Sequence, residues 1–366
     1  MNGSPTTTDP PSPPQPDAER ILIVRPTALG DVARTVPALV TLRRAYPNAT
    51  IDWLVAKAFA PAVRNHPMLD GVVEFDRKAM ARFGFSIRAT RAGLELARRL
   101  HQAGYDTVYD LQGLFRSGLF TRLTGARRRV GFANAREAGW LGYNVRHRID
   151  TNLHTVDRML ALLRADGLEP VHDMRLYLAE QDRAWLRAFK EQHGIGESGY
   201  ACLAPTARWG CKCWPIERYG EIARRLIEQC LAGDKIVLIA SPDERSRVLP
   251  ILDILEQAGI PSAEHVIFPE TTVGQMMALL SETRLLVCND SAPLHIAVGF
   301  DRPVVAIFGP TDPALVGPYR RESSVIRPDN AEAHAANYRR HMDDPTLIAQ
   351  VSVDQVWEKV RETLPV

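Results

Sequence analysis

The amino-acid sequence predicts an α/β fold composed of two tandem domains, each built around a parallel β-sheet. Short apolar, β-branched runs alternate with longer segments of helical periodicity, and this alternation restarts near residue 200. Strands that are apolar along nearly their whole length are typical of parallel sheets covered by helices on both faces. The chain length of 366 residues also suits two domains of ordinary size better than one.

The first half of the chain contains five candidate strands, at residues 21–25, 50–56, 71–76, 106–111 and 128–132. Apolar residues at helical spacing predict two helices there, over 31–46 and 90–102. The second half repeats the pattern, with strands expected at 200–205, 235–240, 264–268, 284–288 and 303–308 and helices expected at 216–231, 243–258, 273–282 and 292–298. Parallel sheets bind ligands at the carboxyl ends of their strands, so we expect a ligand site in a cleft between the two sheets.

The composition suggests where the domains begin and end. Six of the first sixteen residues are proline, and this polar segment buries too little apolar surface to become ordered, so residues 1–18 are expected to form a disordered tail. The first domain is then expected over 19–175 and the second over 176–345. The amphipathic segment within residues 346–366 is expected to form a helix that returns to pack on the first domain.

The composition also bears on the cellular compartment. The five cysteines are an odd number without a CxxC pair, which favours a reducing compartment and gives no sign of a metal site. The start of the chain lacks the apolar core of a signal peptide, and no stretch approaches the roughly 20 apolar residues of a membrane span. We therefore expect a cytoplasmic protein that is at most peripherally bound to a membrane.

Positive charge is concentrated in one part of the chain. Residues 77–148 contain fifteen Lys and Arg against four Asp and Glu, an excess of eleven, although the whole chain carries only +2. These cations could form a solvated, arginine-rich surface, or they could attract a polyanion or an anionic membrane surface. No nucleic-acid-binding motif accompanies them, so nucleic acid is the less favoured partner.

Asp31 is the first candidate for chemistry, because it follows the first strand in the turn PTALGD. That turn has a single glycine and no GK[ST], so it matches neither the dinucleotide-binding motif nor the P-loop. An Asp at this position could cap the following helix, or it could serve as a general base at the edge of the cleft. A helix N-terminus would lower the pKa of this carboxyl group whereas burial would raise it, and the sequence leaves the balance open.

The segment LLVCNDSAPLHIAVGF, residues 285–300, places a second candidate site after a strand of the second half. Asp290 and Ser291 stand before a helix whose first amides, at residues 292–294, would form an anion-binding site. Asp290 would repel a phosphate unless its oxygens face sugar hydroxyls, which indicates a ligand that carries both a phosphate and a polyol. His295, in the first turn of that helix, is either a structural histidine or part of the site.

A third candidate segment, APTARWGCKCWPIERYG at residues 204–220, begins where another strand ends. Its loop carries Arg208 and Lys212, whose charges suit a diphosphate. Such cations are also common on any surface loop, but here they fall on the same strand ends as the helix amides of the second candidate site. Together these features predict a nucleotide-diphosphate pocket in the second domain, opposite Asp31.

These segments resemble a known family. The motifs LGDVARTVPAL, DLQGLFRSG, PTARWGCKCWP and NDSAPLHIAVGFDRPVVAIFGPTDP resemble the ADP-heptose:lipopolysaccharide heptosyltransferases of glycosyltransferase family 9, over nearly the whole chain from about residue 20. The resemblance implies a GT-B fold of two Rossmann-like domains, with the acceptor on the first and the sugar nucleotide on the second. It also implies inverting transfer of heptose from ADP-L-glycero-D-manno-heptose to the lipopolysaccharide inner core (Kdo-lipid A or a heptosylated form), with no required metal or cofactor.

The resemblance implies roles for particular residues as well. Asp31 matches the presumed catalytic base, and Lys212 matches the lysine that contacts the donor phosphates. The expected donor-binding set is completed by Thr206, Arg208, Asp290, Ser291, Ala292 and His295. Two positions depart from the family pattern: Ala292 stands where glycine is common, which narrows the approach of the backbone to a ligand, and Arg34 stands where histidine is common.

The same resemblance gives the basic window a candidate partner. The cations expected to face the carboxylates and phosphates of a lipopolysaccharide precursor are Arg77, Lys78, Arg116 and Arg136. Contact with the anionic cytoplasmic face of the inner membrane is a further expectation. Besides a heptosyltransferase, two alternatives stay open: a GT-B enzyme that transfers or epimerises another nucleotide sugar, and a catalytically silent sugar-nucleotide-binding protein.

Overall fold

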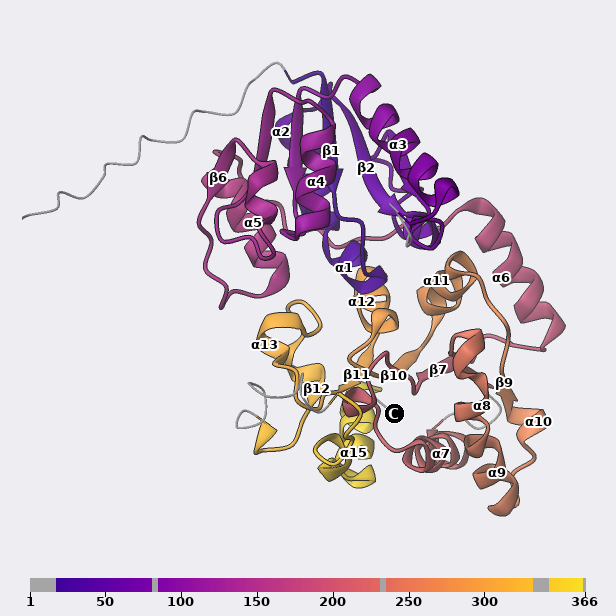
Figure 1. Ribbon diagram of the computed structural model, residues 1–366. Helices are drawn as coiled ribbons and strands as arrows, with labels where there is room; N and C mark the ends of the chain where they lie inside the picture. The colour runs from indigo at the N-terminus through magenta and orange to yellow at the C-terminus, as the bar shows by residue number, and fades with distance from the viewer. Residues whose placement is uncertain (1–17, 81–84, 231–234, 332–341, 365–366) are drawn as a thin grey trace, which may run out of the picture.

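The computed structural model of the chain describes residues 18–80, 85–230, 235–331 and 342–364. Figure 1 shows two α/β domains, one above the other, each with helices packed around a central sheet. Both sheets have six strands, and every strand pairs with its neighbours in parallel. The predicted tail lies outside the described residues except for Ala18, which is buried in the core of the first domain.

The first domain contains all five predicted strands and one more. Its strands are β1 (Arg20–Val24), β2 (Thr50–Ala56), β3 (Gly71–Phe75), β4 (Thr107–Asp110), β5 (Arg128–Phe132) and β6 (Val145–His147), in the spatial order β3-β2-β1-β4-β5-β6. Its helices are α1 (Leu29–Arg34), α2 (Val36–Ala45), α3 (Ile87–Gln102), α4 (Phe115–Leu123) and α5 (Thr155–Ala165). The helix predicted over 31–46 is divided into α1 and α2, because Pro37 lacks the amide that would continue α1.

The second domain repeats this strand order. Its strands are β7 (Tyr200–Ala204), β8 (Lys235–Leu238), β9 (Val266–Ile267), β10 (Leu285–Asn289), β11 (Val304–Ile307) and β12 (Val325–Ile326), ordered β9-β8-β7-β10-β11-β12. Its helices include α6 (Glu180–Gln192), α7 (Ile216–Arg225), α8 (Arg245–Val248), α9 (Pro250–Gln257), α10 (Ser262–His265), α11 (Val273–Glu282), α12 (Ala292–Gly299) and α13 (Pro313–Val316). In both domains the chain leaves the centre of the sheet in two directions, so the switch points lie between β1 and β4 and between β7 and β10.

The central strands of each sheet are buried on both faces, as the apolar runs predicted. Within β1, Leu22 and Val24 belong to the core under α3 and α4, whereas Ile21 and Ile23 belong to the core under α2 and α5. The latter core continues into the second domain, where it is covered by α6, α11 and α12. Of the helices in the described part of the chain, none is both long and apolar enough to cross a membrane.

The last helix, α15 (Val353–Thr363), does not pack where the sequence analysis placed it. It lies against α7, β11 and β12 of the second domain (Figure 1, yellow), so the expected return to the first domain is wrong. Its apolar stripe, Val356, Trp357 and Val360, is buried in the core of the second domain. Polar contacts hold the preceding segment in place, since the indole of Trp214 donates a hydrogen bond to the carbonyl of Val351 at 2.9 Å.

The two domains meet where α1 contacts α12, and Figure 1 shows α1 directly above α12. Gly30 permits this approach, because a Cβ atom at that position would lie only 2.8 Å from Cδ2 of His295. Arg34 adds a polar link, in which its Nη1 donates to the carbonyl of Val316 at 2.9 Å. The carboxyl ends of both sheets therefore face each other across a direct helix–helix contact.

Candidate functional site

Asp31 lies in the first turn of α1, at the switch point of the first sheet. Its Oδ2 accepts a hydrogen bond from the amide of Ala28 at 3.3 Å, so the carboxylate does satisfy the start of the helix. Its Oδ1 also pairs with Arg34 Nη2 at 2.5 Å and with Arg25 Nη2 at 3.3 Å. The side chain of Asp31 remains 31% exposed, so a ligand at the junction can reach it.

Two arginines determine the charge state of Asp31. Burial raises its pKa, but the charges of Arg25 and Arg34 and the hydrogen bond from Ala28 together lower it more, and the pKa lies well below the usual range for Asp. Both arginines are themselves buried, so water screens their charges little. The sequence did not show whether burial or stabilising contacts dominate the pKa of Asp31. In the structure the stabilising contacts dominate, and the carboxylate is ionised throughout the physiological pH range.

Lys212 and Asp290 form the matching site of the second domain, after β7 and β10. Lys212 Nζ lies 2.5 Å from Asp290 Oδ2, and the hydroxyl of Thr311 donates to the same oxygen at 2.9 Å. The two side chains are 16% and 8% exposed. Because Lys212 neutralises Asp290, the repulsion that Asp290 would exert on a phosphate is offset.

Asn289 fixes the loop that carries Lys212. This side chain is fully buried, and its Oδ1 accepts hydrogen bonds from the amide of Trp214 and the hydroxyl of Tyr219, each at 3.1 Å. Its Nδ2 donates to the carbonyl of Pro205 at 2.7 Å. The last residue of β10 thereby holds both ends of the loop between β7 and α7, and we assign Asn289 as a positioning residue.

The start of α12 presents backbone donors to the junction. Ser291 is the N-cap residue, but its hydroxyl donates to the carbonyl of Asn289 at 3.3 Å instead of capping the helix. Pro293 has no N–H group, so the expected anion-binding amides reduce to those of Ala292 and Leu294 at this turn.

His295 is buried between the domains and does not act as a cation. Burial lowers its pKa well below the usual value, and the nearby charge of Arg34 lowers it further. The charges of Asp31 and Lys212 also influence this pKa. The geometry agrees, because a Cβ atom on Gly30, next to Asp31, would lie 2.8 Å from Cδ2 of His295 and 3.4 Å from Cα of Ala292. His295 thus packs the junction as a neutral side chain.

Two further donor-site candidates lie on the loop around Lys212. The hydroxyl of Thr206 donates to Glu244 Oε2 at 3.1 Å. Arg208 is exposed, with its guanidinium carbon 4.8 Å from the centroid of the Trp209 ring. Both side chains therefore flank the loop, but neither reaches the Lys212–Asp290 pair through a hydrogen bond.

The four cations expected at the acceptor site are exposed but not gathered in one place. Arg116 lies in the first turn of α4, and the amide of Arg136 donates to the carbonyl of Gly113 at 3.0 Å, so the segments that carry these two residues are neighbours. Arg77 and Lys78 follow β3, at the opposite edge of the sheet. The sheet order therefore separates the four into two pairs.

Arg25, Thr311 and Asn289 are site residues whose partners the sequence analysis did not identify. Arg25 directly follows β1, and Thr311 lies shortly after β11, so both occupy the strand-end positions that singled out Asp31 and Lys212. Their location just after a predicted strand is the signal in the sequence that could have identified them as site residues. Their contacts depend on side-chain geometry, which spacing along the chain does not encode.

The fold and this pair of sites define a class of protein. Two Rossmann-like domains meet at the carboxyl ends of their sheets, which is the architecture of GT-B glycosyltransferases. Residues 94–344 match the sequence model of glycosyltransferase family 9 (heptosyltransferase), and the chain belongs to this family.

Individual relatives agree with this assignment. Lipopolysaccharide heptosyltransferase 1 of Escherichia coli (strain K12) is 29% identical over 315 residues, which cover 84% of this chain and 93% of the relative. Lipopolysaccharide heptosyltransferase 2 of the same strain is 26% identical over 328 residues, covering 84% and 88%.

Solved structures agree with the fold. A family 9 glycosyltransferase from Veillonella parvula DSM 2008 has a TM-score of 0.79 at 21% identity, covering 96% of this chain and 99% of that structure. E. coli heptosyltransferase WaaC with ADP-2-deoxy-2-fluoro heptose has a TM-score of 0.73 at 24% identity, covering 94% and 100%. The GT-B fold of two Rossmann-like domains that the sequence predicted is therefore confirmed, and the protein is a glycosyltransferase.

Proposed function

We propose that this glycosyltransferase transfers heptose, with inversion, from ADP-L-glycero-D-manno-heptose to the inner core of lipopolysaccharide (Kdo-lipid A or a heptosylated form). The observation that carries the proposal is the ionised Asp31 of the first domain, whose neighbour Gly30 abuts Ala292 and His295 of α12, just after Asp290, the partner of Lys212. Relatives named lipopolysaccharide heptosyltransferases, and a solved relative that holds an analogue of ADP-heptose, support the choice of substrates.

In the proposed reaction, Asp31 acts as general base on the acceptor. The acceptor hydroxyl gives its proton to Asp31 while its oxygen attacks the anomeric carbon, and the bond from that carbon to the diphosphate breaks to release ADP. Attack from the face opposite the diphosphate inverts the anomeric centre. Because the pKa of Asp31 is low, the carboxylate is always available, and proton transfer becomes favourable only as the attacking hydroxyl turns acidic in the transition state.

The second domain would stabilise the charge that develops on the departing ADP. Lys212 supplies a cation, held in place by Asp290, and the amides of Ala292 and Leu294 supply donors at a helix start. Arg208 is the exposed cation closest to them in sequence and would contact the donor from solvent. The proposed chemistry uses these protein groups and requires no metal.

The acceptor would be recognised by charge. Arg116 and Arg136 form one exposed pair and Arg77 and Lys78 another, and the anionic sugars and phosphates of a lipopolysaccharide precursor complement both. Because such a precursor is anchored in a bilayer, we propose that the enzyme works at the cytoplasmic face of the inner membrane.

The test is a donor panel. The purified protein is incubated with ADP-heptose or with UDP-sugars, in the presence and absence of Kdo-lipid A, and nucleotide release is measured. We expect ADP release only with ADP-heptose and acceptor together, and a product whose anomeric configuration by NMR is opposite to that of the donor. A UDP-sugar that is turned over faster, or a product with retained configuration, would contradict the proposal.

A further inference from the structure

The first domain carries an apolar and basic face that the proposed reaction does not use. Of the eight large apolar side chains that are exposed in the described part of the chain, seven lie in the first domain and only Leu249 lies in the second. The seven are Phe85, Ile87, Leu94, Phe115, Leu119, Trp140 and Leu141. Phe85 lies just before α3, and the others lie in α3, in α4 and in the short 3-10 helix Gly139–Gly142 after β5. α4 contacts both α3 and this 3-10 helix.

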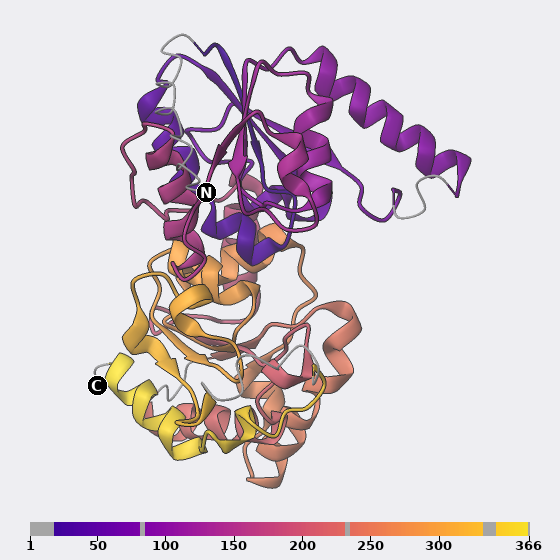
Figure 2. The same cartoon turned by 60° about the vertical axis from the view of Figure 1, so that its left-hand side comes forward.

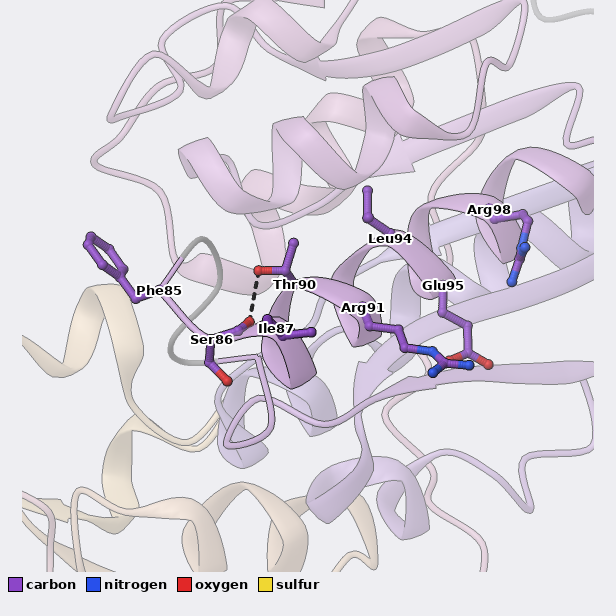
Figure 3. A pocket seen from close by; sticks show the side chains of 8 residues that line it. All are labelled: Phe85, Ser86, Ile87, Thr90, Arg91, Leu94, Glu95 and Arg98. Carbon is purple, nitrogen blue, oxygen red and sulfur yellow. Dashed lines mark hydrogen bonds between the residues drawn. The ribbon is translucent and has the colours of Figure 1, made fainter.

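The most exposed members lie just before α3 and along its first half. Phe85 and Ile87 are each 91% exposed and Leu94 is 61% exposed. The helix start between them is well formed, because Ser86 accepts hydrogen bonds from the amide of Ala89 and, through its carbonyl, from the hydroxyl of Thr90 at 2.9 Å (Figure 3). In Figure 2 this end of α3 projects sideways from the first domain, and it is the end of the helix that lies nearer the level of the second domain.

In the described part of the chain, cations outnumber carboxylates around these apolar side chains, where Glu95 is the one carboxylate that lines the same pocket (Figure 3). Arg88, Arg91 and Arg98 are exposed on α3. Among the Lys and Arg side chains that the structure describes within residues 77–148, only Arg128 forms an ion pair with a carboxylate, that of Asp166. The positive charge of this face is therefore available to an external anion.

We propose that this face of α3, comprising Phe85, Ile87, Leu94, Arg88, Arg91 and Arg98, docks on an anionic lipid bilayer. The apolar side chains would enter the boundary between headgroups and acyl chains, while the arginines bind lipid phosphates, as amphipathic helices do at membrane interfaces. A second copy of the chain is the poorer occupant, because it would place arginines against arginines. The inference deepens the proposed function and rests on it for its biological purpose, since a lipid-anchored acceptor requires an enzyme at the membrane.

The experiment is flotation of the full chain with vesicles of phosphatidylethanolamine and phosphatidylglycerol, compared with vesicles of phosphatidylcholine alone. Two variants remove the two parts of the docking face: Phe85→Ser with Ile87→Ser, and Arg88→Glu with Arg91→Glu and Arg98→Glu. Controls on other surfaces are Leu249→Ser for the apolar part and Arg183→Glu for the charge. Because every substituted side chain is exposed, all variants should keep the wild-type circular dichroism.

We expect wild type and both controls to float with the anionic vesicles and not with phosphatidylcholine. The serine pair should bind roughly tenfold more weakly and the charge reversal about a hundredfold more weakly at low salt. Wild type that stays unbound, or a serine pair that binds like wild type, overturns the inference. The inference is also overturned if wild type sediments as a dimer, the serine pair sediments as a monomer, and wild type does not bind vesicles.

Activity measurements separate this inference from the proposed function. The serine pair should transfer heptose normally to a lipid-free acceptor fragment but poorly to acceptor in vesicles, because the substituted residues are not part of the proposed site. Wild type that floats but transfers no heptose would refute the proposed function and leave the docking face standing. Wild type that transfers heptose to the lipid-free acceptor but does not float would refute the docking face alone.

Discussion

The two domains share one strand order but carry opposite charges at equivalent positions. After the central strand β1 the first domain places an anion, Asp31, whereas after the equivalent strand β7 the second places a cation, Lys212. Each is paired with the opposite charge, Arg25 and Arg34 in the first case and Asp290 in the second. Topology thus determines where a site forms, and the residues at the strand ends determine its chemistry.

The pairing differs in stoichiometry as well as in sign. Two arginines face one carboxylate in the first domain, so the surroundings of Asp31 keep a positive excess, whereas the Lys212–Asp290 pair is neutral. Arg158 is a further cation of this region. Burial lowers its pKa most, and the nearby charges of Arg25 and Arg136 lower it further. Under the proposed function, this excess would suit an acceptor with several anionic groups on the first domain, and the neutral pair would suit a single diphosphate on the second.

The largest expected effect separates chemistry on the first domain from binding on the second. Asp31→Asn should lower kcat by about a thousandfold, because the proton acceptor is lost, and should leave the Kd for ADP unchanged. The control Asp150→Asn replaces an exposed carboxylate of the same domain and should behave as wild type in both assays. Near-wild-type kcat for Asp31→Asn would remove this residue from the role of base.

Asn289→Ala should reveal how strongly the second site depends on its buried support. Three hydrogen-bond partners lose their contact, and we expect the free energy of unfolding in urea to fall by about 3 kcal/mol. The control Asn134→Ala removes one hydrogen bond, to Ile149 in the first domain, and should cost about 1 kcal/mol. Equal losses for the two variants would show that Asn289 is not the main anchor of the Lys212 loop.

Lys212→Ala should weaken the affinity for ADP by roughly 30-fold in calorimetry, because a charged hydrogen bond to phosphate is lost. Without Lys212 the negative charge of Asp290 is no longer neutralised and would repel the diphosphate. The double variant Lys212→Ala with Asp290→Asn should therefore bind ADP more tightly than the single variant. Lys235→Ala, which alters another lysine of the same domain, serves as the control. Unchanged affinity in Lys212→Ala would contradict the assignment of the diphosphate to this site.

The smallest effect concerns the acid side of the pH–rate profile. In the proposed mechanism the rate requires ionised Asp31, so we expect it to fall as the pH drops through the pKa of that group, which lies well below the usual range in the wild type. Arg34→Gln removes a cation, raises this pKa and should move the acid limb upward by about one pH unit. Arg43→Gln, whose partner is Asp70, should not move it. An unmoved limb in Arg34→Gln would show that Arg34 does not set the pKa of Asp31.

The sequence predicted the main sheets because their central strands are buried on both faces and therefore read as continuous apolar runs. It did not predict β6 and β12, which lie at sheet edges and contain only three and two residues. The apolar stripe of α15 predicted that the helix packs, but a stripe does not specify its partner. Trp357 and its neighbours fit the second domain, where Asp354 also pairs with Arg225 at 2.8 Å.

The candidate site was predictable in position but not in its interactions. Asp31, Lys212 and Asp290 follow predicted strands, so the rule that ligands bind at strand ends identified them. The direct pairing of Lys212 with Asp290, and the two arginines around Asp31, arise from side chains that are brought together by tertiary structure. No regular spacing in the sequence signals such contacts.

The central claim is that the diphosphate belongs to the second domain and the proton acceptor to the first. The most direct test is a crystal structure with ADP bound, because the cations around Asp31 offer the diphosphate a competing site. We predict phosphate oxygens within about 3 Å of Lys212 Nζ and of the amides of Ala292 and Leu294. A diphosphate bound instead by Arg25 and Arg34 would contradict the account.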